Sequence, residues 1–251
     1  MRRTVIAGNW KMHKTIQEAT ELVEKLKQNL IDVTGKEVVL CPPFTALSSV
    51  HEIIKDTHIK LGAQNIFWEA EGAFTGEISS TMIKEAGCEF VIIGHSERRK
   101  YFGENGAVVN KKIKLAFSSE LSPIFCVGET LKERENGLAE ETVIKQVNDG
   151  LVGIVEESLE RLIIAYEPVW AIGTGKTATP EVAESMHRLI RSHLSQIYSS
   201  NLSDMVPILY GGSVKPENID SLMHQEDIDG VLVGGASLES ESFTRIVKFM
   251  V

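Results

Sequence analysis

Short, nearly continuous apolar runs recur along the chain, and stretches with helical periodicity separate them. The runs are uninterrupted rather than alternating, which is typical of parallel strands covered on both faces. The pattern predicts eight strands, each followed by a helical segment. The predicted strands are Thr4–Ala7, Glu37–Cys41, Ile59–Ala63, Phe90–Gly94, Pro123–Val127, Leu162–Tyr166, Pro207–Tyr210 and Gly230–Gly234.

Two of the helical stretches begin with recognisable start signals. Thr15-Ile16-Gln17-Glu18 has the spacing of a capping box, and Thr179-Pro180 reads as an N-cap followed by a first helical residue. An apolar stripe follows each signal and is expected to face the sheet. The two stripes are Ile16, Ala19, Leu22, Val23, Leu26 and Leu30, and Val182, Met186, Leu189, Ile190, Leu194 and Ile197.

The order of these elements predicts an α/β fold. Strand-to-strand distances of roughly 20 to 45 residues suit βαβ units with right-handed crossovers. No linker divides the 251 residues, so we expect one catalytic domain, a single-domain (β/α)₈ TIM barrel with eight parallel strands over residues 1–251. An open doubly wound sheet is the alternative. It usually has fewer strands, and here the first strand leads into Gly8-Asn9-Trp10-Lys11 instead of a GxGxxG turn.

Charge and cysteine content narrow the partners and the compartment. The net charge is −9, which disfavours nucleic acid or an anionic membrane surface as a partner but allows a small anionic substrate in a local site. Three dispersed cysteines form no disulfide framework and no CxxC metal site, which favours a reducing, cytoplasmic location. The start of the chain lacks the apolar core of a signal peptide, and no apolar run approaches the roughly 18 residues of a membrane span.

The ends of the last two predicted strands are rich in glycine. In a parallel barrel the active site lies at the carboxyl ends of the strands. Gly211-Gly212-Ser213 and Gly234-Gly235-Ala236-Ser237 follow adjacent strands there. Glycines let main-chain N–H groups approach an oxyanion, and a following helix start adds a favourable dipole. One glycine pair can simply make a tight turn, but two neighbouring pairs favour a phosphate site.

Three charged or titratable side chains follow other strands. Lys11 is the candidate fixed cation, although a lysine at such a position is often merely solvated. His95 precedes Ser96-Glu97, and a helix starting there would disfavour the imidazolium and leave a neutral hydrogen-bond donor for a carbonyl oxygen. Glu167 precedes an apolar segment, Val169–Ile172, so burial is expected to raise its pKa and make it a stronger base. A glycine-containing loop after it is expected to open and close over the substrate.

Two other motifs are incomplete. Gly175-Lys176-Thr177 resembles the end of a P-loop, but Trp170 stands where the first glycine is needed. His51-Glu52 begins an HExxH pattern that ends in Lys55. We therefore expect no metal and no nucleotide cofactor.

Five motifs together resemble the triosephosphate isomerase family: AGNWKM, IIGHSERR, AYEPVWAIGTG, YGGSV and LVGGASL. The resemblance extends from Gly8 to Leu238. It implies an eight-stranded barrel that interconverts dihydroxyacetone phosphate and D-glyceraldehyde 3-phosphate through an enediolate, in glycolysis and gluconeogenesis, without cofactor or metal. The less typical segment 132–150 is expected to be an outer helix.

The resemblance also implies a role for individual residues. Glu167 would be the base, neutral His95 would polarise the carbonyl, Lys11 and Asn9 would stabilise the enediolate, and Glu97 would hold Lys11. The phosphate would be bound by the main-chain N–H groups of Gly173, Ser213, Gly234 and Gly235. The family also implies a homodimer built through the third βα loop, from Gln64 to Ser79, with Thr75 reaching the partner's site.

Two other functions remain open at this point. One is a different phosphosugar isomerase or an aldolase-type barrel, but an aldolase needs a Schiff-base lysine inside a late strand, and the last four predicted strands have none. The other is a phosphate-binding barrel without catalysis. That function would be expected to show a broken Lys11, His95 or Glu167, and all three are present.

Overall fold

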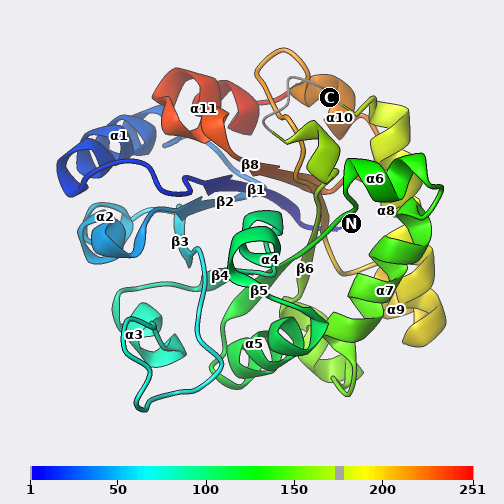
Figure 1. Cartoon of the computed structure of the whole chain (residues 1–251). Coiled ribbons are helices and arrows are strands. Elements are labelled where there is room, and N and C mark those ends of the chain that lie inside the picture. Colours follow the sequence, from blue (N-terminus) through cyan, green and yellow to red (C-terminus); the bar gives the residue numbers. More distant parts are fainter. Residues whose placement is uncertain (1, 173–177, 251) are drawn as a thin grey trace.

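The chain folds into a closed barrel of parallel strands surrounded by helices (Figure 1). The computed structural model describes residues 2–172 and 178–250. Within them, strands β1 to β8 pair in sequence order, every pair is parallel, and β8 closes the barrel against β1. The prediction of a (β/α)₈ barrel is confirmed, and the open sheet is excluded.

The observed strands match the predicted ones with small shifts at their ends. They are β1 (Thr4–Asn9), β2 (Lys36–Cys41), β3 (Lys60–Ala63), β4 (Phe90–Ile93), β5 (Ser122–Val127), β6 (Ile163–Tyr166), β7 (Ile208–Tyr210) and β8 (Gly230–Val233). β1 runs two residues further than predicted and includes Asn9. β4 ends before Gly94, because that residue turns out of the strand with φ of 71°.

The helices lie outside the strands. The α-helices are α1 (Ile16–Asn29), α2 (Leu47–Ile54), α3 (Ser80–Glu85), α4 (Ser96–Phe102), α5 (Gly106–Ser118), α6 (Leu131–Glu135), α7 (Ala139–Leu151), α8 (Pro180–Ile197), α9 (Ser200–Ser203), α10 (Ile219–Met223) and α11 (Ser240–Val247). Short 3₁₀ helices are η1 (Phe44–Ala46), η2 (Glu156–Arg161), η3 (Val169–Ala171) and η4 (Gly235–Leu238). The segment 132–150 is helical as expected, but it is split between α6 and α7.

The apolar residues form two concentric layers, because side chains alternate along each strand. The inner layer fills the barrel with residues such as Ala7, Cys126 and Ala165. The outer layer, which includes Ile164 and Val231, packs between the strands and the helices. The interior of the barrel is therefore a packed core and leaves no room for a substrate.

Both predicted helix starts are confirmed, but the apolar stripes differ at their ends. Thr15 forms a complete capping box with Glu18, and Thr179 caps α8. Ile16 and Ile197 are 49% and 41% exposed, because each lies in a terminal turn of its helix. α8 also buries polar side chains that an apolar pattern does not identify.

One of these buried polar residues is His187, which is fully buried beside Tyr166. Its Nδ1 lies 3.2 Å from the main-chain oxygen of Asp227. Burial lowers the pKa of His187 from 6.5 to about 3. The native protein therefore keeps this ring neutral at pH values where the unfolded chain protonates it.

We expect this histidine to make the fold sensitive to acid. As pH falls below 6.5, the unfolded chain binds a proton at His187 that the native state does not bind until about pH 3. The free energy of unfolding should then fall by about 1.4 kcal/mol per pH unit from this residue alone. Urea unfolding across this range should give a shallower pH dependence for His187→Gln. The exposed His58→Gln is the control and should keep the wild-type slope, and an unchanged slope in His187→Gln would contradict the assignment.

Candidate active site

The alternation of side chains along the strands brings two of the predicted residues to the rim of the barrel. Asn9 is in phase with the inward-facing Val5 and Ala7, and Glu167 is in phase with Ile163 and Ala165. Both lie at the carboxyl end of the barrel, where they line one cavity of about 570 Å³. The same cavity is lined by Lys11, His95, Glu97, Gly211, Gly212, Ser213, Gly234 and Gly235. The rim positions predicted from the sequence therefore converge on a single site.

Glu167 and His95 are in direct contact inside this cavity. Glu167 is 2% exposed, and its Oε1 lies 2.9 Å from Nε2 of His95. Its Oε2 accepts a hydrogen bond from the main-chain N–H of Ser96 at 3.0 Å. His95 is the N-cap of α4 and accepts the Glu97 N–H at Nδ1, 3.2 Å away. The helix predicted to start after His95 is thus present and fixes the orientation of the ring.

The contact between these two side chains controls their pKa values. Burial raises the pKa of Glu167, but His95, the Ser96 N–H and Lys11 outweigh burial and hold it below its ordinary value of 4.5. The expectation of a raised pKa is therefore wrong, because it considered burial without these partners. Burial lowers the pKa of His95, yet the Glu167 and Glu97 carboxylates raise it above its ordinary value. The Glu97 N–H at Nδ1 favours a ring with its proton on Nε2.

Lys11 is held in a strained backbone conformation. Its φ is 53°, in the left-handed region, which for a residue with a Cβ costs about 1–2 kcal/mol. Both of its peptide groups are fixed: the N–H donates to Oδ1 of Asn9 at 3.0 Å, and Nε2 of Gln64 donates to its carbonyl at 2.8 Å. The ammonium group lies 2.7 Å from Oε1 of Glu97. Three side chains from three parts of the barrel thus hold Lys11 at the cavity: Asn9 at the end of β1, Gln64 after β3 and Glu97 in α4.

The glycine-rich turns 211–213 and 234–236 form part of the cavity wall, which we call the glycine wall. A Cβ on Gly235 would meet nothing within 4 Å, and one on Gly234 would meet only the Lys11 side chain, at 3.7 Å. η4 starts at Gly235, and the first N–H groups of a helix have no partners within it. The wall therefore presents main-chain donors close to a lysine, as a phosphate site requires.

The loop after Glu167 is described only in part. Its first turn is η3, where the indole N–H of Trp170 donates to Oε1 of the buried Glu129 at 2.7 Å. Ile172 lines the cavity. Gly173, predicted to bind phosphate, and the rest of the glycine hinge lie outside the described residues.

Sequence reasoning missed the contacts that several residues make in this site. The N–H of Ser96 and the amide of Gln64 act on Glu167 and Lys11 across many residues of sequence, so no local signal indicates them. His13 and Lys215 also line the cavity and add basic groups near the glycines. Lys215 lies two residues after Ser213, so its position near the glycines could have been predicted from the sequence.

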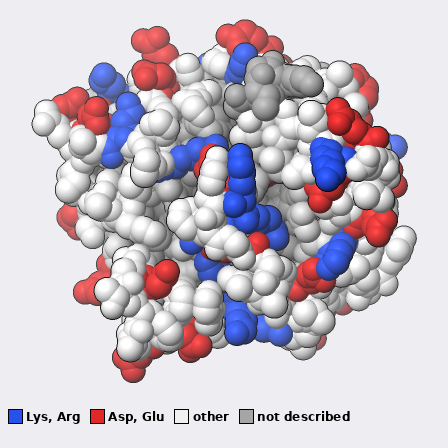
Figure 2. Space-filling model, viewed as in Figure 1, with Lys and Arg blue, Asp and Glu red and all other residues white. Residues whose placement is uncertain are grey.

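Charge is unevenly distributed over the face that carries α4. Figure 2 shows Lys and Arg side chains gathered near its middle and most Asp and Glu side chains toward its edge. The chain has a net charge of −9, so this arrangement is local. It favours the approach of an anion to this face.

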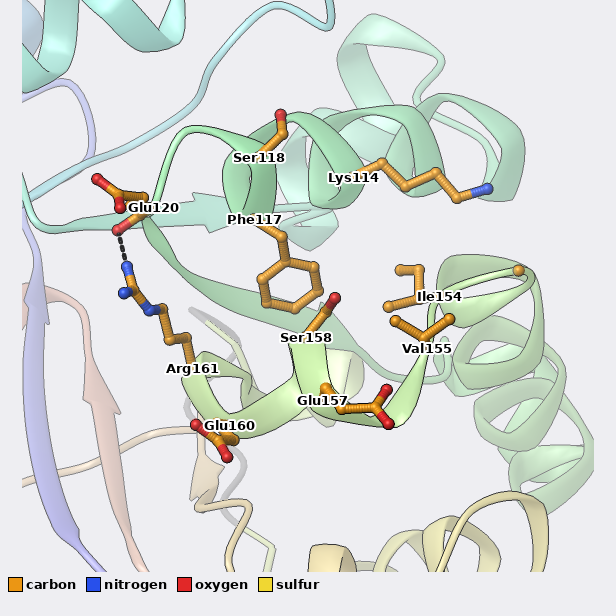
Figure 3. Close-up of a pocket in the computed structure, with 11 residues that line it drawn as sticks. Lys114, Phe117, Ser118, Glu120, Ile154, Val155, Glu157, Ser158, Glu160 and Arg161 are labelled. Atoms are coloured by element: carbon orange, nitrogen blue, oxygen red, sulfur yellow. Dashed lines mark hydrogen bonds between the residues drawn. The ribbon is translucent and has the colours of Figure 1, made fainter.

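A second hollow of about 430 Å³ lies between the end of α5 and η2. The ring of Phe117 points into it, and Arg161 donates a hydrogen bond to the main-chain oxygen of Glu120 (Figure 3). None of the predicted catalytic residues lines it.

Among the residues that the structure describes, no helix is long and apolar enough to cross a membrane.

The chain is similar to known proteins over nearly its whole length. The family model described as triosephosphate isomerase matches residues 4–250. The chain is 54% identical to the triosephosphate isomerase of Roseiflexus sp. (strain RS-1), over 100% of this chain and 98% of that one. It is 56% identical to the triosephosphate isomerase of Carboxydothermus hydrogenoformans, over 99% of both chains. The protein of the same name from Endomicrobium trichonymphae is 54% identical, also over 99% of both.

Proposed function

Because this chain belongs to the triosephosphate isomerase family, we propose that its rim cavity is the active site for the family's reaction. The protein is an aldose–ketose isomerase that interconverts dihydroxyacetone phosphate and D-glyceraldehyde 3-phosphate, and this reaction is a step of glycolysis. The proposal concerns which residues carry the reaction. The observation that supports it most directly is the buried contact of Glu167 with His95, next to Lys11.

In the proposed mechanism Glu167 is the base. Its carboxylate removes a proton from the carbon next to the carbonyl, and the electron pair of that C–H bond forms the enediolate while the carbonyl oxygen becomes negative. Glu167 then returns the proton to the neighbouring carbon, so no atom is gained or lost. Its lowered pKa keeps it ionised and ready to accept the proton. Ser96 and His95 now occupy its two oxygens, so substrate has to displace these contacts before the carboxylate can act.

His95 acts as the hydrogen-bond donor to the developing oxyanion. When Glu167 turns toward the substrate, His95 loses the carboxylate that raises its pKa most. Burial and the start of α4 then favour the neutral ring. Its Nε2–H is free to donate to the substrate oxygen and to shuttle the proton between the two enediolate oxygens.

Lys11 and the glycine wall bind the charged end of the substrate. The ammonium group serves both the phosphate and the enediolate oxygen, and Asn9 holds the Lys11 backbone while its amide nitrogen supplies a second donor. The main-chain N–H groups of Ser213, Gly234 and Gly235 donate hydrogen bonds to the phosphate oxygens. The family resemblance assigns the same role to the N–H of Gly173. Glu97 keeps Lys11 aligned.

The assignment is tested by measuring turnover and anion affinity separately. A change at Glu167 should lower kcat and leave the affinity for inorganic phosphate intact, whereas a change at Lys11 should affect both. Equal losses of turnover and phosphate affinity in both variants would remove the distinction on which these roles rest.

We further propose that residues 1–251 act as one domain that assembles as a homodimer through the loop Gln64–Ser79. Phe74 of this loop is 41% exposed, and Met12, which follows Lys11 in the chain, is 95% exposed, so both segments carry a large apolar side chain at the surface. Exposed apolar groups around a polar cavity favour a protein contact. Gln64 itself donates a hydrogen bond to the Lys11 carbonyl, so a displacement of this loop at the dimer contact would also displace Lys11. Three buried, unpaired cysteines support a reducing, cytoplasmic location for this assembly.

Deleting the loop tip around Thr75 should produce monomers with weak activity. The partner's loop would no longer support Asn9, Lys11 and His95, so kcat should fall, by about 10²-fold for a displacement near 1 Å. Light scattering after size-exclusion chromatography, measured with activity at one protein concentration, checks both expectations. A monomer with wild-type activity would refute the role of the dimer.

A further inference from the structure

Arg99 lies close to the two proposed catalytic residues, because it lines a cavity together with Glu167 and its main chain is bonded to that of His95. It belongs to the first turns of α4, and its main-chain N–H donates to the carbonyl of His95 at 3.1 Å. Helical side chains lean toward the N-terminus of their helix. The Arg99 side chain does so and returns to the ends of β4 and β5.

The guanidinium bridges the main chains of these two strands. Nε donates to the carbonyl of Gly94 at 2.7 Å, and Nη2 donates to the carbonyl of Cys126 at 3.0 Å. The last paired residues of the two strands are Ile93 and Phe125. Arg99 therefore links β4 and β5 just beyond the point where their own hydrogen bonding stops.

Each of the two carbonyls belongs to a residue that is next to one proposed catalytic residue. Gly94 precedes His95 in the chain. Cys126 faces into the barrel, where the nearby Glu167 carboxylate adds to the effect of burial in raising the pKa of its thiol. A movement of the Gly94 carbonyl would therefore shift His95, and a movement of Cys126 would shift the side chain that lies near Glu167.

The structure keeps space for this guanidinium. Gly94 has a positive φ, and a Cβ there would lie 2.9 Å from Nη2 of Arg99. Within the described part of the chain, both side-chain hydrogen bonds of Arg99 go to main-chain carbonyls and no carboxylate forms an ion pair with it. Burial lowers the pKa of Arg99, and the Glu167 carboxylate partly offsets this. A partly buried cation that has no carboxylate partner costs free energy of folding, so its presence at this place points to a role in the site.

We propose that Arg99 is a positioning residue for the isomerase reaction, because it clamps the carbonyls of Gly94 and Cys126 and so keeps His95 and Glu167 at their working separation. This inference rests on the proposed roles of His95 and Glu167. Arg99 itself is not among the residues that line the rim cavity, so we assign it a positioning role and no direct role in the chemistry.

A cavity beside Arg99 makes the idea testable by chemical rescue. It measures about 340 Å³ and is lined by Arg99 and Glu167 together with Gly128, Glu133 and Gln146. A water molecule takes about 30 Å³ of liquid, so a guanidinium ion fits in such a space. In Arg99→Ala the ion can enter where the side chain was removed.

The experiment compares Arg99→Ala, Arg99→Lys and a matched control. Arg161→Ala is the control, since Arg161 also donates to a main-chain carbonyl, that of Glu120, but at the hollow between α5 and η2 (Figure 3). We expect kcat of Arg99→Ala to fall by about 10²-fold, as for a small misplacement of catalytic groups. Inhibition by inorganic phosphate should change by less than about twofold, because the glycine wall is untouched. Guanidinium chloride at millimolar, non-denaturing concentration should restore kcat by about tenfold or more, and Arg161→Ala should show neither loss nor rescue.

Several results would overturn the proposal. These are a kcat of Arg99→Ala close to that of the wild type, a parallel loss of phosphate affinity, or a folded variant that guanidinium does not rescue. If Arg99→Ala does not fold, Arg99→Lys decides: one ammonium group cannot span both carbonyls, so its kcat must fall while its melting temperature stays near that of the wild type. Full activity in Arg99→Lys would refute the clamp. Full activity in His95→Gln would instead refute the proposed site itself, whatever Arg99 does.

Discussion

Replacing Glu167 by glutamine is expected to lower kcat by about 10²–10⁴-fold, the range that a general base contributes. Glutamine has nearly the same shape and can still contact His95 and the Ser96 N–H, but it cannot accept a proton from carbon. The affinity for inorganic phosphate should stay nearly unchanged, because Lys11 and the glycine wall are intact. Steady-state kinetics with glyceraldehyde 3-phosphate, with phosphate as inhibitor, give both values.

The matched control for this change is Glu160→Gln. Glu160 is exposed at the far hollow shown in Figure 3, so its replacement removes the same charge without touching the rim. It should leave kcat unchanged. Activity of Glu167→Gln within tenfold of the wild type would show that another group is the base.

Replacing Lys11 by methionine is expected to damage binding and turnover together. The methionine side chain fills a similar volume but has no charge, so the phosphate and the enediolate oxygen lose one shared donor. Hydrogen bonds to charged groups contribute about 1.5–3 kcal/mol, so KM should rise and kcat should fall by about tenfold or more each. Kinetics in both reaction directions would measure the two effects.

Lys25→Met on α1 is the control for the change in net charge, because Lys25 is exposed and is not among the residues that line the rim cavity. It should behave as the wild type at moderate ionic strength. An unchanged KM in Lys11→Met would place the cation outside the binding site.

The barrel and the rim residues were readable from the sequence because both follow from periodicity. Strands covered on both faces give continuous apolar runs, and alternation then fixes that Asn9 and Glu167 point inward at the carboxyl end. Gly94 and Gly234 were assigned to strands although they leave them, because a backbone turn at glycine has no apolar signature. Local capping signals at Thr15 and Thr179 needed only neighbours in sequence, and both were correct.

The properties that depend on residues far away in the chain could not be predicted from the sequence. The pKa of Glu167 was predicted with the wrong sign because the sequence shows its apolar neighbours and not His95, which reaches it only in the folded barrel. The strained Lys11 needs Gln64, which local patterns cannot connect to it. Polar residues buried on α8, such as His187, were hidden because their partners come from other elements.

The central claim is that Glu167 carries the proton between the two carbons, and solvent exchange tests it most directly. A proton held on a carboxylic acid exchanges with solvent before it returns to carbon. Isomerisation in D₂O by the wild type should therefore place deuterium on the carbon that receives the proton, and mass spectrometry of the product measures it. The account predicts that Glu167→Gln loses isomerisation and deuterium incorporation together. If Glu167→Gln still incorporated deuterium at the wild-type rate, Glu167 would not be the base.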